Sequence, residues 1–195
     1  MTEPLIGFPA PVRRVAEPRV TPGSRAEIGV VNAALSALLG RATGSGPPHV
    51  FTTLARHRRL FRAWLRFAGR LMPFGTLPRR DTELVILRVA VNCGNDYEWG
   101  HHVALGRRAG LTPEQIERVG EGPQAGGWSA RERALLRAVD ELGADHVVSD
   151  ETWAELRVTY SERQLIELCL LAGHYEMLAG TLNSLGVRPE RTSPA

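Results

Sequence analysis

The residues best suited to proton transfer lie close together in one predicted helix, which spans about 95–109. Asn95, Glu98 and His102 are separated by three and four residues, so an α-helix places them on one face. A carboxylate one turn before an imidazole can fix the tautomer of the ring and raise its basicity, as a general acid or base requires. The same pair can also be a buried ion pair with a structural role, or can face a subunit contact, so these interpretations stay open.

The neighbouring His101 allows two metal-binding interpretations, and both are weak. With Glu98 it forms a Glu-x-x-His pair, which is half of the pattern that binds a di-iron centre in helical bundles. The second half is missing, because the similar segment near the C-terminus has Ala179 three residues after Glu176. Adjacent helical histidines point about 100° apart, and no third zinc ligand is evident. We expect neither a metal nor any other cofactor.

The composition argues against several other mechanisms. All 24 basic residues are arginines, so the chain has no primary amine for a Schiff base, for pyridoxal phosphate attachment or for a Walker-type phosphate site. The two cysteines, Cys93 and Cys169, form no paired motif, which argues against a disulfide framework and favours a reducing, cytoplasmic location. The start lacks a signal-peptide pattern, and no stretch approaches the ~20 apolar residues of a membrane span, so we expect no membrane association.

Positive charge is concentrated in one part of the chain, although the formal net charge is only +3. Residues 28–80 contain nine arginines and no acid, and four of these arginines recur on one helix face: Arg59, Arg62, Arg66 and Arg70. Another face carries the predicted buried residues Leu60, Trp64, Phe67 and Leu71. No helix-turn-helix, zinc-finger or RNA-binding motif accompanies the arginines, so we expect a solvated or subunit-facing edge and no nucleic-acid partner.

The chain is predicted to be all-α, because proline, glycine and capping residues separate apolar helical segments and no period-two pattern indicates strands. Its 195 residues fit one domain, at 24–190, behind a proline-rich arm at 1–23 that is extended and can wrap a neighbour. Helices are expected at about 25–39, 50–71, 78–94 and 95–109, with a turn at 44–48. Three more begin at capping boxes, Thr112 with Gln115, Ser129 with Glu132, and Ser161 with Gln164.

Two segments of the chain resemble each other. An apolar helix, an aromatic-acid-apolar triplet and a glycine helix stop follow one another at 83–111 and again at 164–187. Two copies of a helical hairpin can pack about a pseudo-two-fold axis and cover each other's apolar faces. In the second copy Ala179, Gly180 and Thr181 replace the histidines, so the polar residues of the first copy are not a requirement of the repeat. Chance similarity between two amphipathic helices is the alternative.

Three runs of residues together carry a resemblance to a known family: Asp81-Thr82-Glu83-Leu84-Val85-Ile86-Leu87-Arg88-Val89-Ala90, Tyr97-Glu98-Trp99-Gly100-His101-His102 and Gly110-Leu111-Thr112-Pro113-Glu114-Gln115-Ile116. They are similar to the carboxymuconolactone decarboxylase family of the alkylhydroperoxidase D-like superfamily. The resemblance is strong over about 54–119 and looser as far as residue 187. It implies an all-α fold with an internal helical-hairpin repeat and a homo-oligomer, commonly a trimer or a hexamer.

Peroxidases of this superfamily use a glutamate, a Cys-x-x-Cys pair and a histidine as a proton relay around a redox disulfide. Aligning the histidine with His102 places the glutamate at Glu83 and the two cysteines at Asn95 and Glu98. The chain therefore resembles a branch without the redox pair. Thiol-dependent peroxide reduction is not expected, because it needs one thiol to attack and a second to resolve the product.

The resemblance implies a cofactor-independent enzyme that decarboxylates or isomerises a small carbonyl or carboxylate compound through an enolate. We expect Glu83, Glu98 and His102 to be catalytic, with His102 as proton donor, Glu98 as its orienting partner and Glu83 as a second acid or base. Two carboxylates near one imidazole raise the pKa of the ring or of one carboxyl, which suits proton transfer near neutral pH.

Three further residues are expected to bind the substrate: Asn95 as an orienting amide, Tyr97 as a hydroxyl donor, and His101. Arg88 is a weaker candidate for anchoring an anion, since it lies roughly 140° round the helix from Glu83. The alternatives to an enzyme are a non-catalytic oligomeric binding module and a peroxidase relative that has lost its redox activity.

Overall fold

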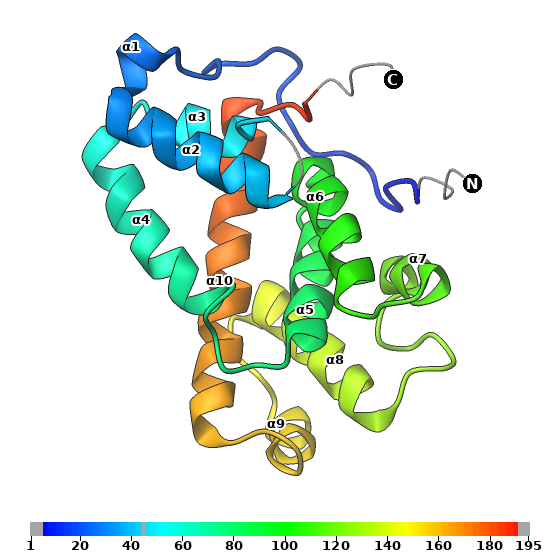
Figure 1. Ribbon diagram of the computed structural model, residues 1–195. Helices are drawn as coiled ribbons and strands as arrows, with labels where there is room; N and C mark the ends of the chain where they lie inside the picture. Colours follow the sequence, from blue (N-terminus) through cyan, green and yellow to red (C-terminus); the bar gives the residue numbers. More distant parts are fainter. Residues whose placement is uncertain (1–5, 44–45, 191–195) are drawn as a thin grey trace.

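The computed structural model describes residues 6–43 and 46–190, and in these ranges it contains ten α-helices and no strand (Figure 1). The predicted all-α fold class is therefore confirmed. In chain order the helices are α1 (Arg25–Ile28), α2 (Val30–Thr43), α3 (His49–Leu54), α4 (Arg58–Leu71), α5 (Arg79–Asn92), α6 (Asp96–Arg108), α7 (Pro113–Glu121), α8 (Ala130–Asp145), α9 (Asp150–Arg157) and α10 (Glu162–Leu185).

Helices α5 and α10 form the centre of the fold. α5 packs against α6, α7, α8 and α10, and α10 also contacts α4, α8 and α9. In Figure 1, α10 runs through the middle of the molecule with α4 on one side and α5 on the other. Leu84, Val85, Ile86 and Leu87 are all fully buried, although they point to different sides of α5. A helix that is apolar all round in this way is one enclosed by other helices.

Helix α10 has the length and composition of a candidate membrane span, which the sequence analysis did not predict. Polar residues such as His174 and Glu176 interrupt its apolar run, so the helix does not contain an unbroken stretch of apolar residues. Its most apolar stretch is 56% buried inside the protein. The core helix of a helical bundle passes the same test of length and composition, so this feature of α10 is weak evidence for a membrane span.

Two of the predicted helices are each divided into two. The helix expected at 25–39 becomes α1 and α2, because Gly29 has a φ of 82° and interrupts the helical backbone between them. The helix expected at 50–71 is divided after Leu54, and His57 has the non-helical angles φ −93° and ψ 75° as the N-cap of α4. Part of the turn expected at 44–48, Gly44 and Ser45, lies outside the described residues.

The helix starts that carry capping boxes are confirmed. The side chains of Thr112, Ser129 and Ser161 each accept a hydrogen bond from the backbone N–H three residues later. Helix α9 was not predicted, although Ser149 caps it by accepting from the Thr152 N–H. The signal was a serine followed by acids in the first helical turn, without the Glu or Gln that completes a capping box.

The second copy of the predicted repeat is not a hairpin. In the first copy Gly94, with a φ of 61°, separates α5 from α6. The corresponding segments of the second copy lie on the single uninterrupted helix α10. The hairpin of α5 and α6 therefore packs against one long helix, and the predicted pair of hairpins is wrong in this respect.

The buried face of α4 agrees with the predicted one at Leu71, which is 5% exposed, and differs from it at other positions. Phe61 is buried, whereas Leu60 and Phe67 are 60% and 43% exposed. Phe61 packs with Ile28 and Ala55 in a small second core under α1 and α3, and this contact sets the orientation of α4. The four arginines of the stripe are exposed, as predicted: Arg59, Arg62, Arg66 and Arg70.

The described part of the arm, residues 6–23, packs on its own chain. The Arg13 N–H donates to the Gly94 carbonyl at 2.8 Å, and the Arg19 N–H donates to the Leu185 carbonyl at 2.9 Å. Arg14 forms an ion pair of 2.8 Å with Asp96 at the start of α6. The arm is extended, as predicted, and it covers the turn between α5 and α6 and the end of α10 (Figure 1).

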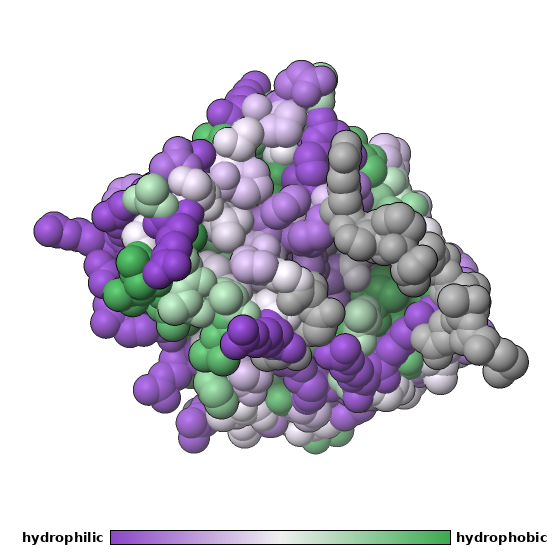
Figure 2. Space-filling model, turned by 45° about the horizontal axis from the view of Figure 1, so that its top comes forward, coloured by the Kyte–Doolittle hydropathy of each residue, from purple (hydrophilic) through white to green (hydrophobic). Residues whose placement is uncertain are grey.

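Apolar side chains remain exposed on three helices. They are Val30, Val31 and Leu38 on α2, Leu60 and Phe67 on α4, and Ile166, Leu170 and Met177 on α10. On the face that Figure 2 shows, hydrophobic side chains form separate patches among hydrophilic ones. Exposed apolar side chains that gather on neighbouring helices mark surfaces that contact other molecules.

Candidate active site

The imidazole of His102 lies between the carboxylates of Glu83 and Glu98. His102 Nδ1 is 2.7 Å from Glu83 Oε2, and His102 Nε2 is 3.4 Å from Glu98 Oε2. The three residues are buried, with exposed fractions of 0% for Glu83, 5% for Glu98 and 4% for His102. The structure therefore brings together the three residues that were expected to be catalytic.

The hairpin of α5 and α6 creates this arrangement. Glu83 lies one turn into α5 and His102 lies 19 residues later in α6, across the turn at Gly94. The two helices approach closely beside the cluster because Gly106 has no side chain. A Cβ at this position would lie 3.0 Å from Leu111 Cδ1 and 3.8 Å from Glu83 Cβ.

The electrostatics of the cluster favour a charged imidazole. Burial disfavours the charged ring, but the charge and hydrogen bond of Glu83, together with the contact of Glu98, outweigh it and raise the pKa of His102 to about 9. His102 is therefore an imidazolium at neutral pH, and both ring nitrogens carry protons. Such a ring is a proton donor whose conjugate base is strong enough to take the proton back.

Helix α10 covers the cluster with aromatic side chains that the sequence analysis did not single out. The Tyr175 ring meets the His102 ring edge to face, with 5.2 Å between centroids. Burial and the nearby Glu98 and Glu83 raise the pKa of the Tyr175 hydroxyl well above its ordinary value. His174 lies beside Tyr175 and stacks on Trp64 at 6.0 Å, and burial lowers its pKa. Among the described residues, the buried Nδ1 of His174 has no hydrogen-bond partner.

Arg79 is a further charged residue at the cluster that the sequence analysis did not assign. Its Nη2 lies 2.7 Å from Glu83 Oε1, one helical turn away. The two residues form an i,i+4 pair, a signal that was readable in the sequence. Arg88, the predicted anchor, lies elsewhere: its guanidinium binds Asp140 Oδ1 at 2.6 Å and the Val119 carbonyl at 2.9 Å.

Asn95 has a structural role in this molecule. Its Oδ1 accepts a hydrogen bond of 2.7 Å from the Glu98 N–H and so caps α6. Its Nδ2 donates to Asn183 Oδ1 at 2.8 Å and to the Ala179 carbonyl at 3.2 Å, which joins α6 to α10. With its amide used in this way, Asn95 positions Glu98, and the structure does not place it as a substrate ligand.

Tyr97 and His101 face the C-terminal segment instead of the cluster. The Tyr97 hydroxyl donates to Glu190 Oε1 at 2.7 Å, and His101 Nε2 lies 3.0 Å from Glu190 Oε2. The backbone N–H of His49 is a third donor to the Glu190 carboxylate. Burial alone would raise the pKa of Glu190, but these hydrogen bonds lower it to about 2. Tyr97 and His101 thus both bind the Glu190 carboxylate, and the structure does not bring these two residues to His102.

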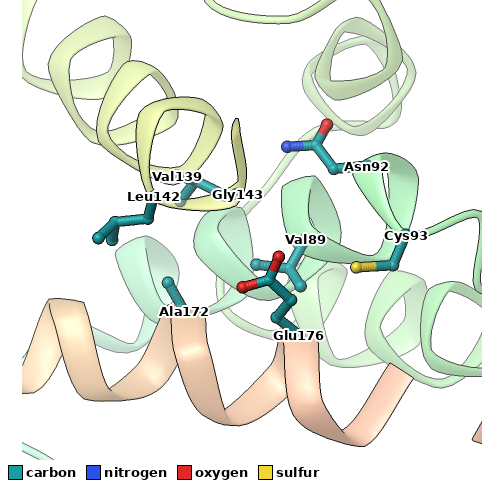
Figure 3. Close-up of a pocket in the computed structure, with 8 residues that line it drawn as sticks. All are labelled: Val89, Asn92, Cys93, Val139, Leu142, Gly143, Ala172 and Glu176. Atoms are coloured by element: carbon teal, nitrogen blue, oxygen red, sulfur yellow. The ribbon is translucent and has the colours of Figure 1, made fainter. Parts of the chain in front are cut away.

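Neither cysteine belongs to the cluster. Cys93 lies with Asn92 and Glu176 beside a cavity of about 10 Å³ between α5, α8 and α10, the size of a single water molecule (Figure 3). In Figure 3 the Glu176 carboxylate lies in the same small space as the Cys93 thiol. Burial and the charge of Glu176 raise the pKa of Cys93 to about 11, and burial also raises the pKa of Cys169. Both thiols therefore stay protonated at neutral pH.

A second, larger hollow of about 260 Å³ lies on the surface between α8 and the end of α9. It is lined by Arg131, Arg133 and Arg137, and Arg137 is already paired with Glu155 at 3.3 Å. Neither hollow is lined by Glu83, Glu98 or His102. Within residues 6–43 and 46–190, no group of three or more His, Cys, Asp or Glu side chains is arranged to hold a metal ion.

Comparison with known proteins finds a match to a family model and similar solved structures. The model of the carboxymuconolactone decarboxylase family matches residues 58–141, a range that contains Glu83, Glu98 and His102. Among curated proteins no match was found.

Several solved structures share the fold of most of the chain. The alkylhydroperoxidase AhpD core of an uncharacterized peroxidase-related protein from Ralstonia eutropha JMP134 matches with a TM-score of 0.76 and 21% identity, over 90% of this chain and 95% of that chain. An uncharacterized peroxidase-related protein from Silicibacter sp. TM1040 matches with a TM-score of 0.77 and 15% identity, over 91% and 96%. The debrominase Bmp8 in its apo form matches with a TM-score of 0.74 and 17% identity, over 88% and 92%. At these identities the likeness shows a shared fold.

Proposed function

We propose, since residues 58–141 match the model of the carboxymuconolactone decarboxylase family, that the protein is an enzyme in which Glu83, Glu98 and His102 carry out acid/base chemistry. Its substrate is a small carbonyl or carboxylate compound, and its reaction is a decarboxylation or an isomerisation through an enolate. The single observation that carries the proposal is the His102 ring between two buried carboxylates, 2.7 Å and 3.4 Å from its nitrogens.

The chemistry follows from the charges of these groups. In a decarboxylation, the bond to the departing carboxylate breaks and its electron pair passes into a conjugated carbonyl, which becomes an enolate. The His102 imidazolium then donates a proton to the enolate carbon, and the neutral ring regains a proton from solvent through a carboxyl group. In an isomerisation, a carboxylate or the neutral ring first removes a proton from one carbon of the substrate. The His102 ring then returns a proton at a second carbon.

The two carboxylates have different tasks in this scheme. The short contact of Glu83 with Nδ1 fixes the ring and stabilises its charge. The longer contact of 3.4 Å between Glu98 and Nε2 leaves the Nε2 proton the less tightly held of the two. We therefore assign proton donation to Nε2, with Glu83 as the positioning base and Glu98 as the group that guides the proton.

The state of the cysteines argues against the alternative of an active thiol peroxidase. The two positions that align with a redox pair hold Asn95, which caps α6, and Glu98, which contacts His102. The nearest thiol is Cys93, and its pKa of about 11 keeps it protonated, whereas a peroxidatic cysteine reacts as the thiolate.

Untargeted metabolite screening with the purified protein tests the proposal. The wild type should consume a small carbonyl or carboxylate compound, and the single variants Glu83→Gln and His102→Gln should each lower kcat by at least about 100-fold. An exposed control, His146→Asn, should retain full activity. If the double variant Glu83→Gln with His102→Gln consumed the same compound at the wild-type rate, the acid/base proposal would be wrong.

A non-catalytic binding module is the second candidate function, and burial of the cluster favours it. A buried ion pair can serve only to specify the packing of α5 against α6. In that case His102→Ala should lower the free energy of unfolding by about 3–5 kcal/mol, because it leaves buried carboxylates without a partner. An enzyme loses similar stability in His102→Ala, and it differs from a binding module in that the shape-conserving variant His102→Gln folds but loses turnover.

A further inference from the structure

Three arginines line the surface hollow of about 260 Å³ between α8 and the end of α9: Arg131, Arg133 and Arg137. The rest of its lining consists of Ala130, Glu155, Val158 and Thr159. A single water molecule needs only about 10–15 Å³ of accessible volume, so the hollow can admit a group of several heavy atoms. The lining includes no residue of the acid/base cluster.

One buried carboxylate holds the two walls of the hollow. Asp81 of α5 is fully buried, and its Oδ2 accepts a hydrogen bond of 2.8 Å from the hydroxyl of Tyr160, the residue after Thr159. The same oxygen lies 3.2 Å from Nη1 of Arg131 on α8. Helices α8 and α9 also pack against each other (Figure 1). Both walls are therefore attached to the core of the fold.

Carboxylates hold the arginines of the hollow only at long distances. Arg131 Nη1 lies 3.2 Å from Asp81 Oδ2. Arg137 Nη1 lies 3.3 Å from Glu155 Oε1 and 3.5 Å from Glu151 Oε1, and Glu151 is 81% exposed. Other arginine pairs of the described chain measure 2.6–2.8 Å: Arg14 with Asp96, Arg80 with Glu132, and Arg88 with Asp140. Charge-assisted hydrogen bonds are normally about 2.7–2.9 Å long, so the arginines of the hollow keep donors available for a ligand.

Arg133 has no carboxylate partner in the part of the chain that the structure describes. Its Nη2 donates to the Trp128 carbonyl over 3.4 Å. The adjacent acid, Glu132, is bound elsewhere, since it accepts from the Ser129 hydroxyl at 2.6 Å and pairs with Arg80 at 2.6 Å. The side chains that line the hollow thus carry three positive charges and one negative charge, which favours an anion.

The arrangement of these arginines suits a phosphate group. Arg133 and Arg137 are one turn apart on α8, and Arg131 reaches the hollow from another side of the same helix. A carboxylate offers two oxygens in one plane, whereas a phosphate monoester offers three around a tetrahedral centre and carries up to two charges. Glu155 and Thr159 provide acceptors for hydroxyl groups at the same hollow.

We propose that this hollow binds a small phosphate monoester that carries hydroxyl groups, such as a sugar phosphate. Arg131, Arg133 and Arg137 hold the phosphate group, and Glu155 and Thr159 bind the hydroxyl groups. This second site does not depend on the proposed function, because no residue of the acid/base cluster takes part in it.

Binding of simple probes tests the proposal. The probes are ribose 5-phosphate and glycerol 3-phosphate, the uncharged sugar ribose, and the dicarboxylate succinate. Calorimetry in a phosphate-free buffer of low ionic strength gives dissociation constants for the wild type, Arg133→Gln, Arg137→Gln and the control Arg108→Gln, an exposed arginine of α6. All variants are first checked for a native melting curve, and Arg133→Gln should fold because it leaves no carboxylate without its partner.

We expect the wild type to bind at least one of the two monoesters and to prefer it to ribose and to succinate. Arg133→Gln and Arg137→Gln should each bind this monoester at least about tenfold more weakly, because each loses charge-assisted hydrogen bonds to the phosphate. Arg108→Gln should match the wild type.

Four results would overturn the proposal. The wild type could bind neither monoester, or it could bind succinate as tightly as the monoesters. Equal affinity in Arg133→Gln and Arg108→Gln would mean that the overall positive charge attracts the probes. A lower mass of Arg133→Gln in light scattering, without monoester binding by the wild type, would assign the hollow to a contact with an acidic segment of a second copy.

Discussion

At the scale of single residues, the buried His102 ring keeps its proton because two carboxylates surround it. Burial works against the charge, and the carboxylates of Glu83 and Glu98 together more than offset this effect. The pKa of His102 therefore rises to about 9 in the folded protein, whereas an unfolded histidine has a pKa of 6.5. Protonation of this residue is in consequence coupled to folding.

The first prediction concerns the pH dependence of stability. A group whose pKa is raised on folding contributes its full stabilisation below the unfolded value of 6.5, and this contribution is lost as the pH rises through about 9. One pKa unit corresponds to about 1.4 kcal/mol, so the total is on the order of 3 kcal/mol. Urea unfolding between pH 6.5 and 9.5 should show this loss in the wild type and in the control His146→Asn. It should be absent in His102→Gln, and a wild-type stability that stays constant or rises over this range would contradict the prediction.

At the scale of helices, local signals and long-range contacts contribute in different ways. Thr112, Ser129 and Ser161 predict helix starts correctly because a cap involves only residues within one turn. The division between α3 and α4 was not predicted because it depends on distant contacts. Arg58 donates to the carbonyls of Glu27 and Ala26 at 2.9 Å and 2.8 Å, and these bonds hold the start of α4 against the end of α1.

The C-terminal segment gives the second prediction. Glu190 binds the His49 N–H, Tyr97 and His101, so Glu190→Gln should lower the free energy of unfolding at pH 7 by about 1–3 kcal/mol, as expected for hydrogen bonds to a charged group. Since the pKa of Glu190 falls from 4.5 to about 2 on folding, its contribution is present above pH 4.5 and is lost as the pH falls toward 2.

Hydrogen exchange and urea unfolding check this second prediction. The amides of α3 and of residues 186–190 should exchange faster in Glu190→Gln. The control Glu117→Gln, on the exposed side of α7, should leave both exchange and stability unchanged. Equal protection of α3 in the two variants would mean that the segment is held by other contacts.

At the scale of the whole molecule, the site was predictable in part. The pairing of Glu98 with His102 follows from helical spacing, and Glu83 was assigned from the resemblance, because no local pattern links it to His102 across 19 residues. The role of Tyr97 could not be predicted, since its partner Glu190 lies 93 residues away in sequence. Arg79 was missed although its spacing from Glu83 was visible.

The exposed apolar residues of α4 and α10 give the third prediction, which is that the protein is a homo-oligomer. Leu60 and Phe67 on α4 and Ile166, Leu170 and Met177 on α10 are exposed on helices that pack against each other. Light scattering should give a mass that is a multiple of the 21.4 kDa chain, with a trimer or a hexamer expected from the family resemblance. The double variant Leu170→Glu with Met177→Glu should lower this mass, the control Val158→Glu should not, and a monomeric wild type would contradict the prediction.

The central claim is that His102 is an imidazolium held between two carboxylates, ready to donate a proton. NMR titration of the ring nitrogens of His102 in the wild type measures this directly, with His102→Gln used to assign the signal. The account predicts a pKa of about 9, and a lower value in Glu83→Gln because the largest favourable contact is then lost. A His102 pKa at or below the ordinary 6.5 would contradict the account, because the ring would then be neutral at physiological pH and would have no proton to give.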